Sequence, residues 1–449
     1  MSKTGIAKLS RMRWWSLYSL SRLGLCVIVG LSIGLSGLSG LCMAAPANTT
    51  AATGSAVPTL HMTQDLPSVA ARGDRTEGAM PTPAMPAASA ANMVAIAPFV
   101  NSGLLPGRLR MALLVPMRSP ALRGAAEMVR DGFRAAHQRD GANVDLNIIE
   151  TDDDPQNITV LYRDAVIRYD VLVGPLSRSG VAAVATGGNV TRPTIALGQP
   201  ETVGGLEPVL PPKMLIMGLS IEEEARQAAD WAARLHPGAR ALVLSTGVAW
   251  QRRAARAFTN QWKRGDSFAE TLEMASSGGA LTAADLASLK KRMNGAAPGV
   301  IFVALDAAQA RQLRPTIGKR SAVYGTSQLN VLNRADAGAA QPQPELEGVR
   351  LLDLPWQLQA DHPAVMIYPH APVRGEQRRS PDYERLYALG IDAFRVAREI
   401  GAGHQSFTLD GVTGQLAVQF DGIRPAVFVR SEQPARYAAG AVAPVLDGR

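Results

Sequence analysis

The chain has 449 residues, of which 47% are hydrophobic and 19% are charged, a balance that suits a folded protein with sizeable cores. The formal net charge is +8, but the first 47 residues hold five basic residues and no acidic one. The remaining 41 basic and 38 acidic residues leave a net charge of +3, with no basic stripe that would predict nucleic-acid binding. Both cysteines, Cys26 and Cys42, also lie in this first segment, which excludes disulfides, zinc-thiolate sites and thiol catalysis from the rest.

Residues 1–47 have the order of an export signal, either cleaved or retained as a membrane anchor. A basic start is followed by an uncharged apolar run from Leu23 to Leu41 and then by small residues. The run is long for a cleaved signal, so a membrane span also fits. Cys42 offers a third interpretation, as a cysteine that carries a lipid after cleavage, although Leu41 stands where a lipoprotein signal has Gly or Ala.

Residues 48–105 are rich in Ala, Thr, Ser, Pro and Gly and contain few large apolar side chains. Such a segment cannot bury enough surface to offset the entropy lost on ordering. We therefore predict a disordered tether between the export signal and the folded part of the chain.

From Arg108 onward, short apolar runs alternate with amphipathic stretches, which predicts an α/β fold with parallel sheets and right-handed crossovers. The first half is predicted to contain strands at 110–115, 144–149, 171–173 and 194–197 and helices at 122–140 and 160–169, with a further helix after Ser177 or Ser179. The same alternation of strands and helices begins again at a capping-box pattern on Ser220. This second half is predicted to contain strands at 241–244, 268–274, 300–305, 322–324 and 349–352 and helices at 220–231, 250–262, 284–293, 307–313 and 383–400. Two successive lobes are the natural interpretation, with a β-rich stretch at 415–430.

The segment Asp170–Ala185 combines a buried strand, a Gly174-Pro175 turn and a helix that Ser177 or Ser179 can cap. The carboxyl end of such a strand, facing a helix amino terminus, is where open α/β sheets hold small ligands. The turn is therefore either a binding loop or a well-capped crossover, and both interpretations stay open. Trp250, which follows a strand of the second lobe, likewise either stacks on a ligand or packs in the core.

Sequence signatures of several enzyme classes are missing. The first turn of the fold lacks the glycines of a dinucleotide site, there is no phosphate-binding Walker loop, and the serines near Gly174 do not have the Gly-x-Ser-x-Gly spacing. The histidines are scattered, so no metal site is predicted, and the acidic run 152–154 is interpreted as a helix-capping turn. We predict a protein that is not an enzyme and has no cofactor.

A series of motifs in order resembles a known family. They include ALLVPMRSP, DVLVGPLSRSGVAAVA, TRPTIALGQPE, IFVALDAAQARQLRP, LEGVRLLDLPW and GVTGQLAVQFDGIRP, and together they cover about residues 108–430. The chain is similar in this way to penicillin-binding-protein activators, the LppC-type outer-membrane lipoproteins of Gram-negative bacteria. Members of this family often carry a large helical-repeat domain before the shared module, whereas here the tether precedes it.

The resemblance implies a two-lobed type I periplasmic-binding-protein fold, similar to leucine-binding proteins, in an exported protein of the periplasm. Lobe one is expected at about 108–218 plus 356–402 and lobe two at about 219–352 plus 403–430, with 431–449 as a tail. Hinge crossovers are expected near Gly218, near 352–356 and after Ala402. Attachment to the outer or inner membrane would depend on the N-terminal segment alone.

Two functions follow as expectations from the resemblance. The first is a non-catalytic regulator of peptidoglycan synthesis that binds a penicillin-binding protein, a cell-wall synthase, and favours its active state. The second is a solute-binding or sensing protein for an amino acid or a similar small anion. The positions that match ligand-binding positions of the fold are Ser177, Ser179, Ala196, Gly198, Trp250 and Ser327, and Asp353 is a weak candidate for an ammonium partner.

Overall fold

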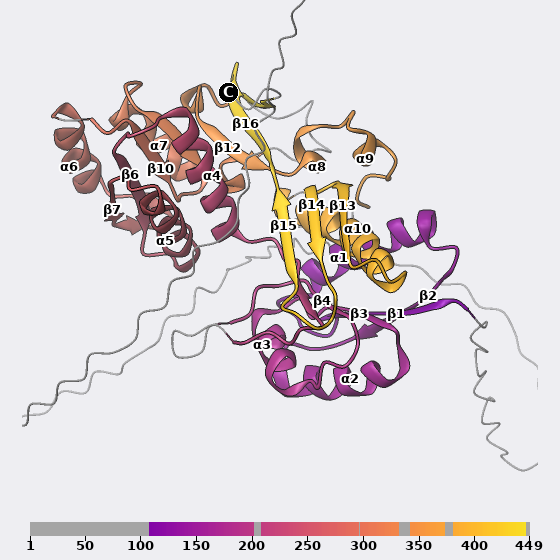
Figure 1. Ribbon diagram of the computed structural model, residues 1–449. Coiled ribbons are helices and arrows are strands. Elements are labelled where there is room, and N and C mark those ends of the chain that lie inside the picture. Colours follow the sequence, from indigo (N-terminus) through magenta and orange to yellow (C-terminus); the bar gives the residue numbers. More distant parts are fainter. Residues whose placement is uncertain (1–106, 202–207, 296, 332–341, 373–379, 446–449) are drawn as a thin grey trace, which may run out of the picture. The chain divides into compact units, whose positions relative to one another are not determined.

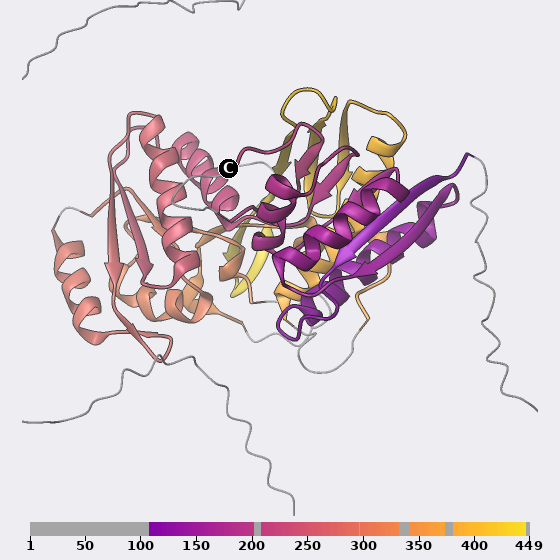
Figure 2. The ribbon, with the colours of Figure 1, turned by 90° about the horizontal axis from the view of Figure 1, so that it is seen from below.

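The computed structural model describes residues 107–201, 208–295, 297–331, 342–372 and 380–445, which all belong to one compact unit (Figure 1). The predicted export signal, with Cys42, and the predicted tether lie outside the described residues. The described part forms two lobes, each built on its own mainly parallel sheet (Figures 1 and 2). The predicted α/β class is therefore confirmed.

Lobe one is built on a parallel five-stranded sheet with the order β2-β1-β3-β4-β5. Its strands are β1 (Leu109–Val115), β2 (Val144–Glu150), β3 (Val171–Val173), β4 (Thr194–Ala196) and β5 (Met214–Ile216). The helices α2 (Pro155–Arg168) and α3 (Arg178–Gly187) pack on one face of the sheet. The helices α1 (Arg123–Asp140) and α10 (Pro381–Gly401) pack on the other. Because helices cover both faces of the sheet, its central strands are continuous apolar runs. This pattern allowed the strands to be predicted from the sequence. The short strand β5 was not predicted.

Lobe two is built on a seven-stranded sheet with the order β17-β16-β12-β11-β10-β6-β7. Its strands are β6 (Ala241–Thr246), β7 (Ala269–Met274), β10 (Val300–Val303), β11 (Ala322–Gly325), β12 (Arg350–Asp353), β16 (Gln433–Ala438) and β17 (Ala441–Pro444). The helices α4 (Ile221–Leu235) and α5 (Ala249–Arg264) cover one face, and α6 (Ala283–Asn294) and α7 (Ala307–Ile317) cover the other.

Residues 431–445 of the segment predicted as a tail differ from that expectation, and residues 446–449 lie outside the described residues. Strand β16 pairs antiparallel with β12, and β17 pairs antiparallel with β16, so both extend the sheet of lobe two. Ala435 and Tyr437 are buried in the core of that lobe because alternate residues of β16 face inward.

A third, antiparallel sheet also differs from the predicted division. It consists of β13 (Ser406–Gly411), β14 (Gly414–Gln419) and β15 (Val427–Ser431). The apolar face of this sheet, with Leu416 and Val418, packs in the core that holds α10, so 403–430 adds to lobe one rather than to lobe two. The third crossover therefore lies between β15 and β16, at Glu432, and not after Ala402.

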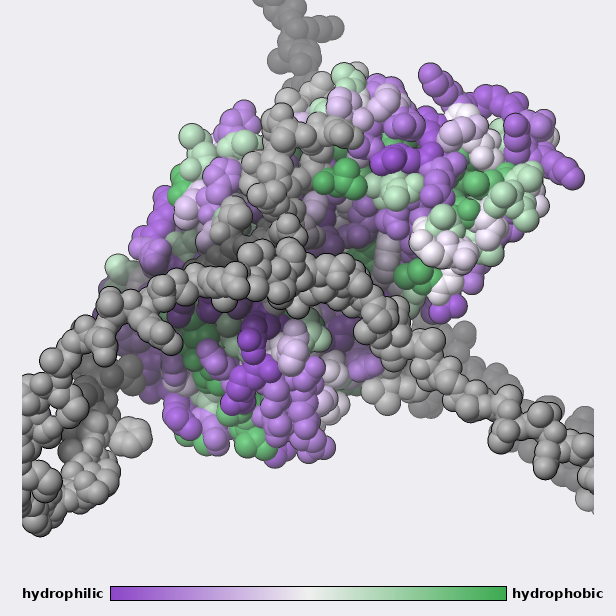
Figure 3. All heavy atoms as spheres, turned by 180° about the vertical axis from the view of Figure 1, so that it is seen from behind, coloured by the Kyte–Doolittle hydropathy of each residue, from purple (hydrophilic) through white to green (hydrophobic). Residues whose placement is uncertain are grey.

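The smaller elements connect these layers. They are the hairpin β8 (Ser276–Ser277) and β9 (Ala280–Leu281), the 3-10 turns η1 (Ser327–Leu329) and η3 (Pro344–Leu346), and the short helices α8 (Pro355–Leu358) and α9 (Pro363–Met366). No helix within the described ranges is long and apolar enough to span a membrane. On the face shown in Figure 3, hydrophobic residues form small groups between hydrophilic ones.

Helix starts follow local chemistry that the sequence displays. The side chains of Asp154, Ser177 and Ser220 each accept a hydrogen bond from a backbone N–H in the first turn of the following helix. The predicted capping turn at 152–154 and the Ser177 cap are thus confirmed. A complete capping box, with both side-chain bonds, occurs at Asp306 and Gln309, where α7 begins.

Helices α1 and α10 cross at two glycines, which lets their backbones approach closely. A Cβ atom on Gly132 would overlap the carbonyl oxygen of Tyr387, and one on Gly390 would overlap the carbonyl oxygen of Val129. The crossing ties the C-terminal helix to the first helix of lobe one, so these positions hold together segments that are far apart in the sequence.

We expect Gly132→Ala to lower the free energy of unfolding by about 2–3 kcal/mol, because the added methyl group forces two packed backbones apart. Gly187→Ala on α3 is the matched control, since the nearest atom to its Cβ would lie at 3.7 Å. The control should leave stability unchanged or raise it by up to about 1 kcal/mol. Urea denaturation measures both, and equal stabilities for the two variants would contradict the close crossing.

Candidate functional site

The chain passes between the two lobes at three crossovers, and buried charged side chains surround them. The crossovers lie between β5 and α4, between β12 and α8, and between β15 and β16. Five residues at these places are almost inaccessible to solvent, and we call them the hinge network: Glu224, Asp353, Arg385, Arg430 and Glu432. Charges so deeply buried persist only where partners compensate their lost hydration.

Arg385 and Asp353 form the central ion pair of the hinge network. Arg385 lies on α10 of lobe one, and Asp353 ends β12 of lobe two. Nε of Arg385 donates to Oδ1 at 2.9 Å and Nη2 to Oδ2 at 2.8 Å, a two-pronged geometry that the planar guanidinium favours. The side chain of Asn330 and the backbone N–H of Leu354 also donate to this carboxylate. Burial opposes the charged form of Arg385, but the carboxylates of Asp353, Asp382 and Glu224 together outweigh burial and raise the pKa of the arginine.

Glu224 joins α4 to the same pair through Ser327. The backbone N–H of Ser327 donates to Oε2 of Glu224 at 2.8 Å and its hydroxyl donates to Oε1 at 3.1 Å. The carbonyl of Ser327 in turn accepts from Nη2 of Arg385 at 3.0 Å. Burial raises the pKa of Glu224 to about 7, although the hydrogen bonds from Ser327 and the charge of Arg385 act in the opposite direction.

Arg430 connects the third crossover to the first by two hydrogen bonds, and Glu432 lies at the third crossover. Arg430 donates from Nη2 to the carbonyl of Met217 at 2.8 Å and from Nη1 to that of Gly218 at 3.1 Å. Burial lowers the pKa of Arg430, with the charge of Glu432 opposing the shift. Burial raises the pKa of Glu432 well above its ordinary value, and the negative charge of Glu224 adds to this effect. Oε2 of Glu432 is buried and has no hydrogen-bond partner among the described residues.

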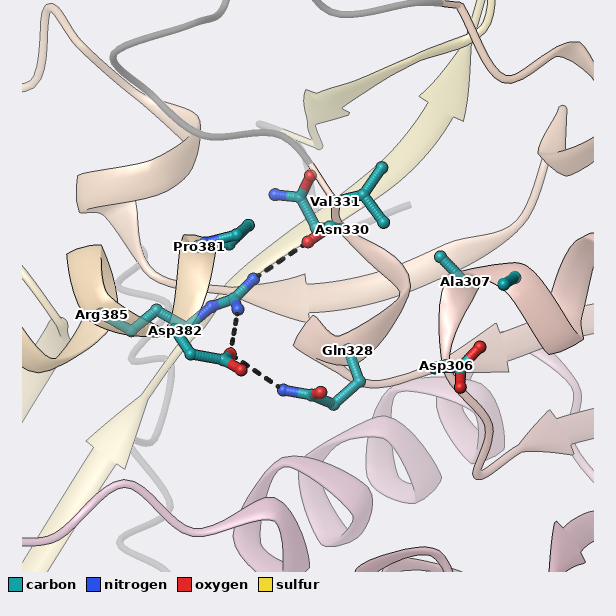
Figure 4. Close-up of a pocket in the computed structure, with 9 residues that line it drawn as sticks. Asp306, Ala307, Gln328, Asn330, Val331, Pro381, Asp382 and Arg385 are labelled. Carbon is teal, nitrogen blue, oxygen red and sulfur yellow. Dashed lines mark hydrogen bonds and ion pairs between the residues drawn. The ribbon is translucent and has the colours of Figure 1, made fainter. Parts of the chain in front are cut away.

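A pocket of about 320 Å³ opens beside the hinge network (Figure 4). The starts of α7 and α10 and the turn η1 line it, with Asp306, Gln328 and Asp382 as polar groups. Asp382 accepts from Nη1 of Arg385 at 2.8 Å and from the side chain of Gln328 at 3.2 Å. Gln328, Asp382 and Arg385 thus bond to one another, whereas Asp306 accepts from the backbone N–H of Gln309 at the start of α7. Among the described residues, no group of acidic and histidine side chains could hold a metal ion.

The lobe-one residues predicted to bind a ligand lie at the carboxyl ends of β3 and β4. Ser177 caps α3 by accepting from the N–H of Gly180 at 3.2 Å, while Ser179 lies within the first turn of that helix. Ala196 is fully buried in the core between the sheet and α2 and α3. Gly198 lies so close to the backbone of Leu176 that a larger residue would clash. These residues are neighbours, and their ligand-binding role stays a prediction.

The lobe-two candidates are placed differently. Trp250 is half-buried in the first turn of α5. Ser327 is buried, and its hydroxyl and N–H both bond to Glu224, so it acts within the hinge network. Asp353, the weak candidate for an ammonium partner, is bonded to Arg385. The aromatic side chains of Trp231, Phe258 and Trp262 are buried in the core of lobe two.

Sequence reasoning did not identify Glu224, Arg385, Arg430 and Glu432 as a group. Arg430 directly follows the apolar run Val427–Val429, which could have drawn attention, whereas Glu224 follows two other glutamates and Glu432 lies between polar residues. Their association could not be read from the sequence because the residues come from segments that are distant along the chain.

Comparison with protein families confirms the resemblance that the motifs indicated. The family model described as "LppC putative lipoprotein" matches residues 107–277 and 272–422, which is well over half of the chain. The chain belongs to the LppC family. The match covers the described residues of both lobes up to residue 422, and it ends before β15, β16 and β17.

Solved structures show the same fold. A protein of Chromobacterium violaceum, described as a "putative branched-chain amino acid ABC transporter", is 34% identical with a TM-score of 0.58, covering 73% of this chain and all of that one. The C-domain of LpoA from Haemophilus influenzae, described as a regulator of PBP1A, is 18% identical with a TM-score of 0.57, covering 75% of this chain and all of that domain. This chain covers 59% of full-length LpoA, at 18% identity and a TM-score of 0.56. A comparison with curated proteins finds no match.

We expect Arg385→Met to lower the free energy of unfolding by about 3–5 kcal/mol, because it leaves the Asp353 carboxylate buried without its main counter-ion. Asp353→Asn should cost a similar amount, and the double variant should cost clearly less than the sum of the two. Arg168→Met removes an exposed pair with Asp164 and should change stability by less than about 0.5 kcal/mol. Additive effects of Arg385→Met and Asp353→Asn in denaturant titrations would contradict direct coupling.

We expect Glu224 to make the free energy of unfolding fall as pH rises. Its folded pKa of about 7 lies above the ordinary value of 4.5, so between these pH values the folded state holds more protons than the unfolded state. The free energy of unfolding is therefore highest below the unfolded pKa, and it falls as pH rises through the folded pKa, by on the order of 3 kcal/mol from this group.

Glu224→Gln should remove most of this slope, which urea titrations at a series of pH values would measure. Glu223→Gln, one position earlier on α4 and about half-exposed in an ion pair with Arg226, is the control and should keep the slope. Identical pH profiles for wild type and Glu224→Gln would show that Glu224 is ionised throughout this range.

Proposed function

We propose that this chain is a non-catalytic periplasmic regulator of peptidoglycan synthesis that binds a penicillin-binding protein and favours its active state. The observation that carries the proposal is the family match over residues 107–422. The likeness to the LpoA C-domain, a regulator of PBP1A, agrees with it at the level of the fold. A regulator of this kind needs only a higher affinity for the active than for the inactive state of its partner, and no chemistry within its own chain.

The same match supports an exported protein that is held at a membrane. The family is described as a lipoprotein family, and Cys42 follows the apolar run of the N-terminal segment. A lipid on Cys42 would keep the module at a membrane, and the tether would let it reach a partner anchored elsewhere. A single acyl chain binds membranes weakly, so more than one lipid chain would be needed for stable attachment.

A second candidate function is solute binding, and one observation favours it. The Chromobacterium violaceum protein matches at 34% identity over its whole length, and its description names a branched-chain amino acid transporter. Ser177 and Gly198 lie at the carboxyl ends of adjacent strands β3 and β4, where small ligands bind in open α/β sheets. Leucine, isoleucine and valine are therefore the first solutes to test.

The regulator proposal is tested with the purified chain, a PBP1A-type synthase from the same bacterium and its lipid-linked glycan precursor. We expect the rate of cross-linked product formation to rise by about fivefold or more and to saturate with added chain, as for a coupling free energy of roughly 1 kcal/mol or above. The heat-unfolded chain serves as the control. An unchanged rate, together with no binding to the synthase in sedimentation, would overturn the proposal.

The solute-binding alternative predicts heat on titration of the folded chain with leucine, isoleucine or valine. Ser177→Ala should then weaken binding by about two- to fivefold without unfolding the protein, since the hydroxyl lies at a helix amino terminus. Thr186→Ala, at the far end of the same helix, is the control. Absence of binding by all three amino acids would remove this alternative and leave the regulator proposal unaffected.

A further inference from the structure

The outer edge of lobe one has a groove between the first helix and an unpaired strand. Its volume is about 480 Å³, and α1 lines one wall with Arg130, Arg134 and His137. Strand β2 lines the other wall with Leu146, Ile148 and Glu150. From this groove we infer a docking site for an extended segment of a partner protein, which adds a strand to β2 and places an acidic side chain against Arg134. The inference goes beyond the proposed function because it holds whichever protein is the partner.

Strand β2 has free backbone hydrogen-bonding groups along this edge. It ends the sheet order, and no described strand pairs with its outer side. On the inner side, Leu109 N donates to the carbonyl of Asn143, and Thr151 N donates to that of Val115. In a parallel ladder the direction alternates from residue to residue, so Leu146, Ile148 and Glu150 direct their N–H and C=O groups away from β1. These are the groups that an added strand would bond.

Two features that usually block strand addition are missing, since no proline and no lysine lies in β2. The strand is regular over seven residues, VDLNIIE, and carries the carboxylates of Asp145 and Glu150. Figure 1 shows β2 at the end of the row formed by β4, β3 and β1. The apolar floor is partly accessible, since Leu146 and Ile148 are only partly buried where they pack against the core.

The charges of the groove indicate an acidic residue in the occupant. Arg134 is exposed near the middle of α1, and no ion pair among the described residues involves it. Arg130 is paired with Asp131 at 2.7 Å, and His137 bonds through Nε2 to the carbonyl of Val144 at 3.1 Å. Arg134 is therefore the cation on this wall that is available to a ligand. Glu150, at the end of β2, would repel an acidic segment that extended over it.

The groove resembles known peptide sites in its physical design. An edge strand supplies main-chain hydrogen bonds that any sequence can use, and a neighbouring helix supplies the contacts that select side chains. Here the selective contact is a single arginine over an apolar floor. An extended protein segment can bond to the backbone of β2 and place an acidic side chain against Arg134 at the same time. A nucleic acid would be repelled by the carboxylate of Glu150 and would find one available cation on the wall formed by α1.

The experiment uses a displayed library of random octapeptides, selected on the full folded chain. We expect enriched peptides to carry an aspartate or glutamate flanked by β-branched residues. A synthetic copy of the strongest peptide should slow hydrogen exchange of the amides in 144–150, because strand addition occupies the outward N–H groups. A copy that is N-methylated at alternate residues should lose binding.

Charge variants then test the assigned contact. Arg134→Glu should weaken the selected peptide by roughly five- to tenfold at low salt, while Glu150→Gln should strengthen it by about twofold. Arg256→Glu is the matched control, because Arg256 is also an exposed arginine on a helix, in lobe two, and should leave binding unchanged. No enrichment, equal binding by wild type and Arg134→Glu, or no protection of 144–150 would each overturn the inference.

Discussion

The buried ion pair between Arg385 and Asp353 is the interaction on which the arrangement of the lobes depends. Two charges lose their hydration here, and only close, two-pronged geometry with further hydrogen bonds compensates that loss. The pair joins the helix that packs against α1 in lobe one to the strand that ends at a crossover in lobe two. An apolar contact could tolerate several relative positions of these elements, whereas the planar guanidinium and the carboxylate tolerate few. The pair therefore restricts the relative positions of these two elements.

The hinge network has more acids than bases, and this imbalance shapes its behaviour. Glu224, Asp353 and Glu432 share a dry region with Arg385 and Arg430. Asp353 has the two-pronged ion pair with Arg385. Glu224 and Glu432 lack such a pair, and burial raises their pKa values. Crossovers in two-lobed proteins are the segments that absorb relative motion of the lobes. Glu224 and Glu432, the two acids with raised pKa values, thus lie close to the segments that join the lobes.

The two candidate functions place the site of action in different parts of the molecule. In a solute-binding protein the carboxyl ends of β3 and β4 would act, around Ser177 and Gly198. In a regulator the outer surfaces act, and the edge of β2 offers backbone groups that no described strand uses. Ser327, a residue that matches a ligand position of the fold, is bonded to Glu224 instead. That use of a matching position for internal structure agrees with the regulator proposal.

The sequence by itself determined the local structure and the class of the protein. Apolar runs such as Val171–Val173 and caps such as Ser177 act over a few residues, so the elements and the α/β class follow from the local pattern. Only the tertiary structure decided which lobe β13–β15 belongs to, that β16 and β17 complete the sheet of lobe two, and that Glu224, Arg385 and Arg430 converge. These outcomes depend on pairings between segments that are distant along the chain, as between β12 and β16 or between Arg430 and Met217. Long-range pairing is decided by packing and by the need to compensate buried charge, and neither is encoded in a local pattern.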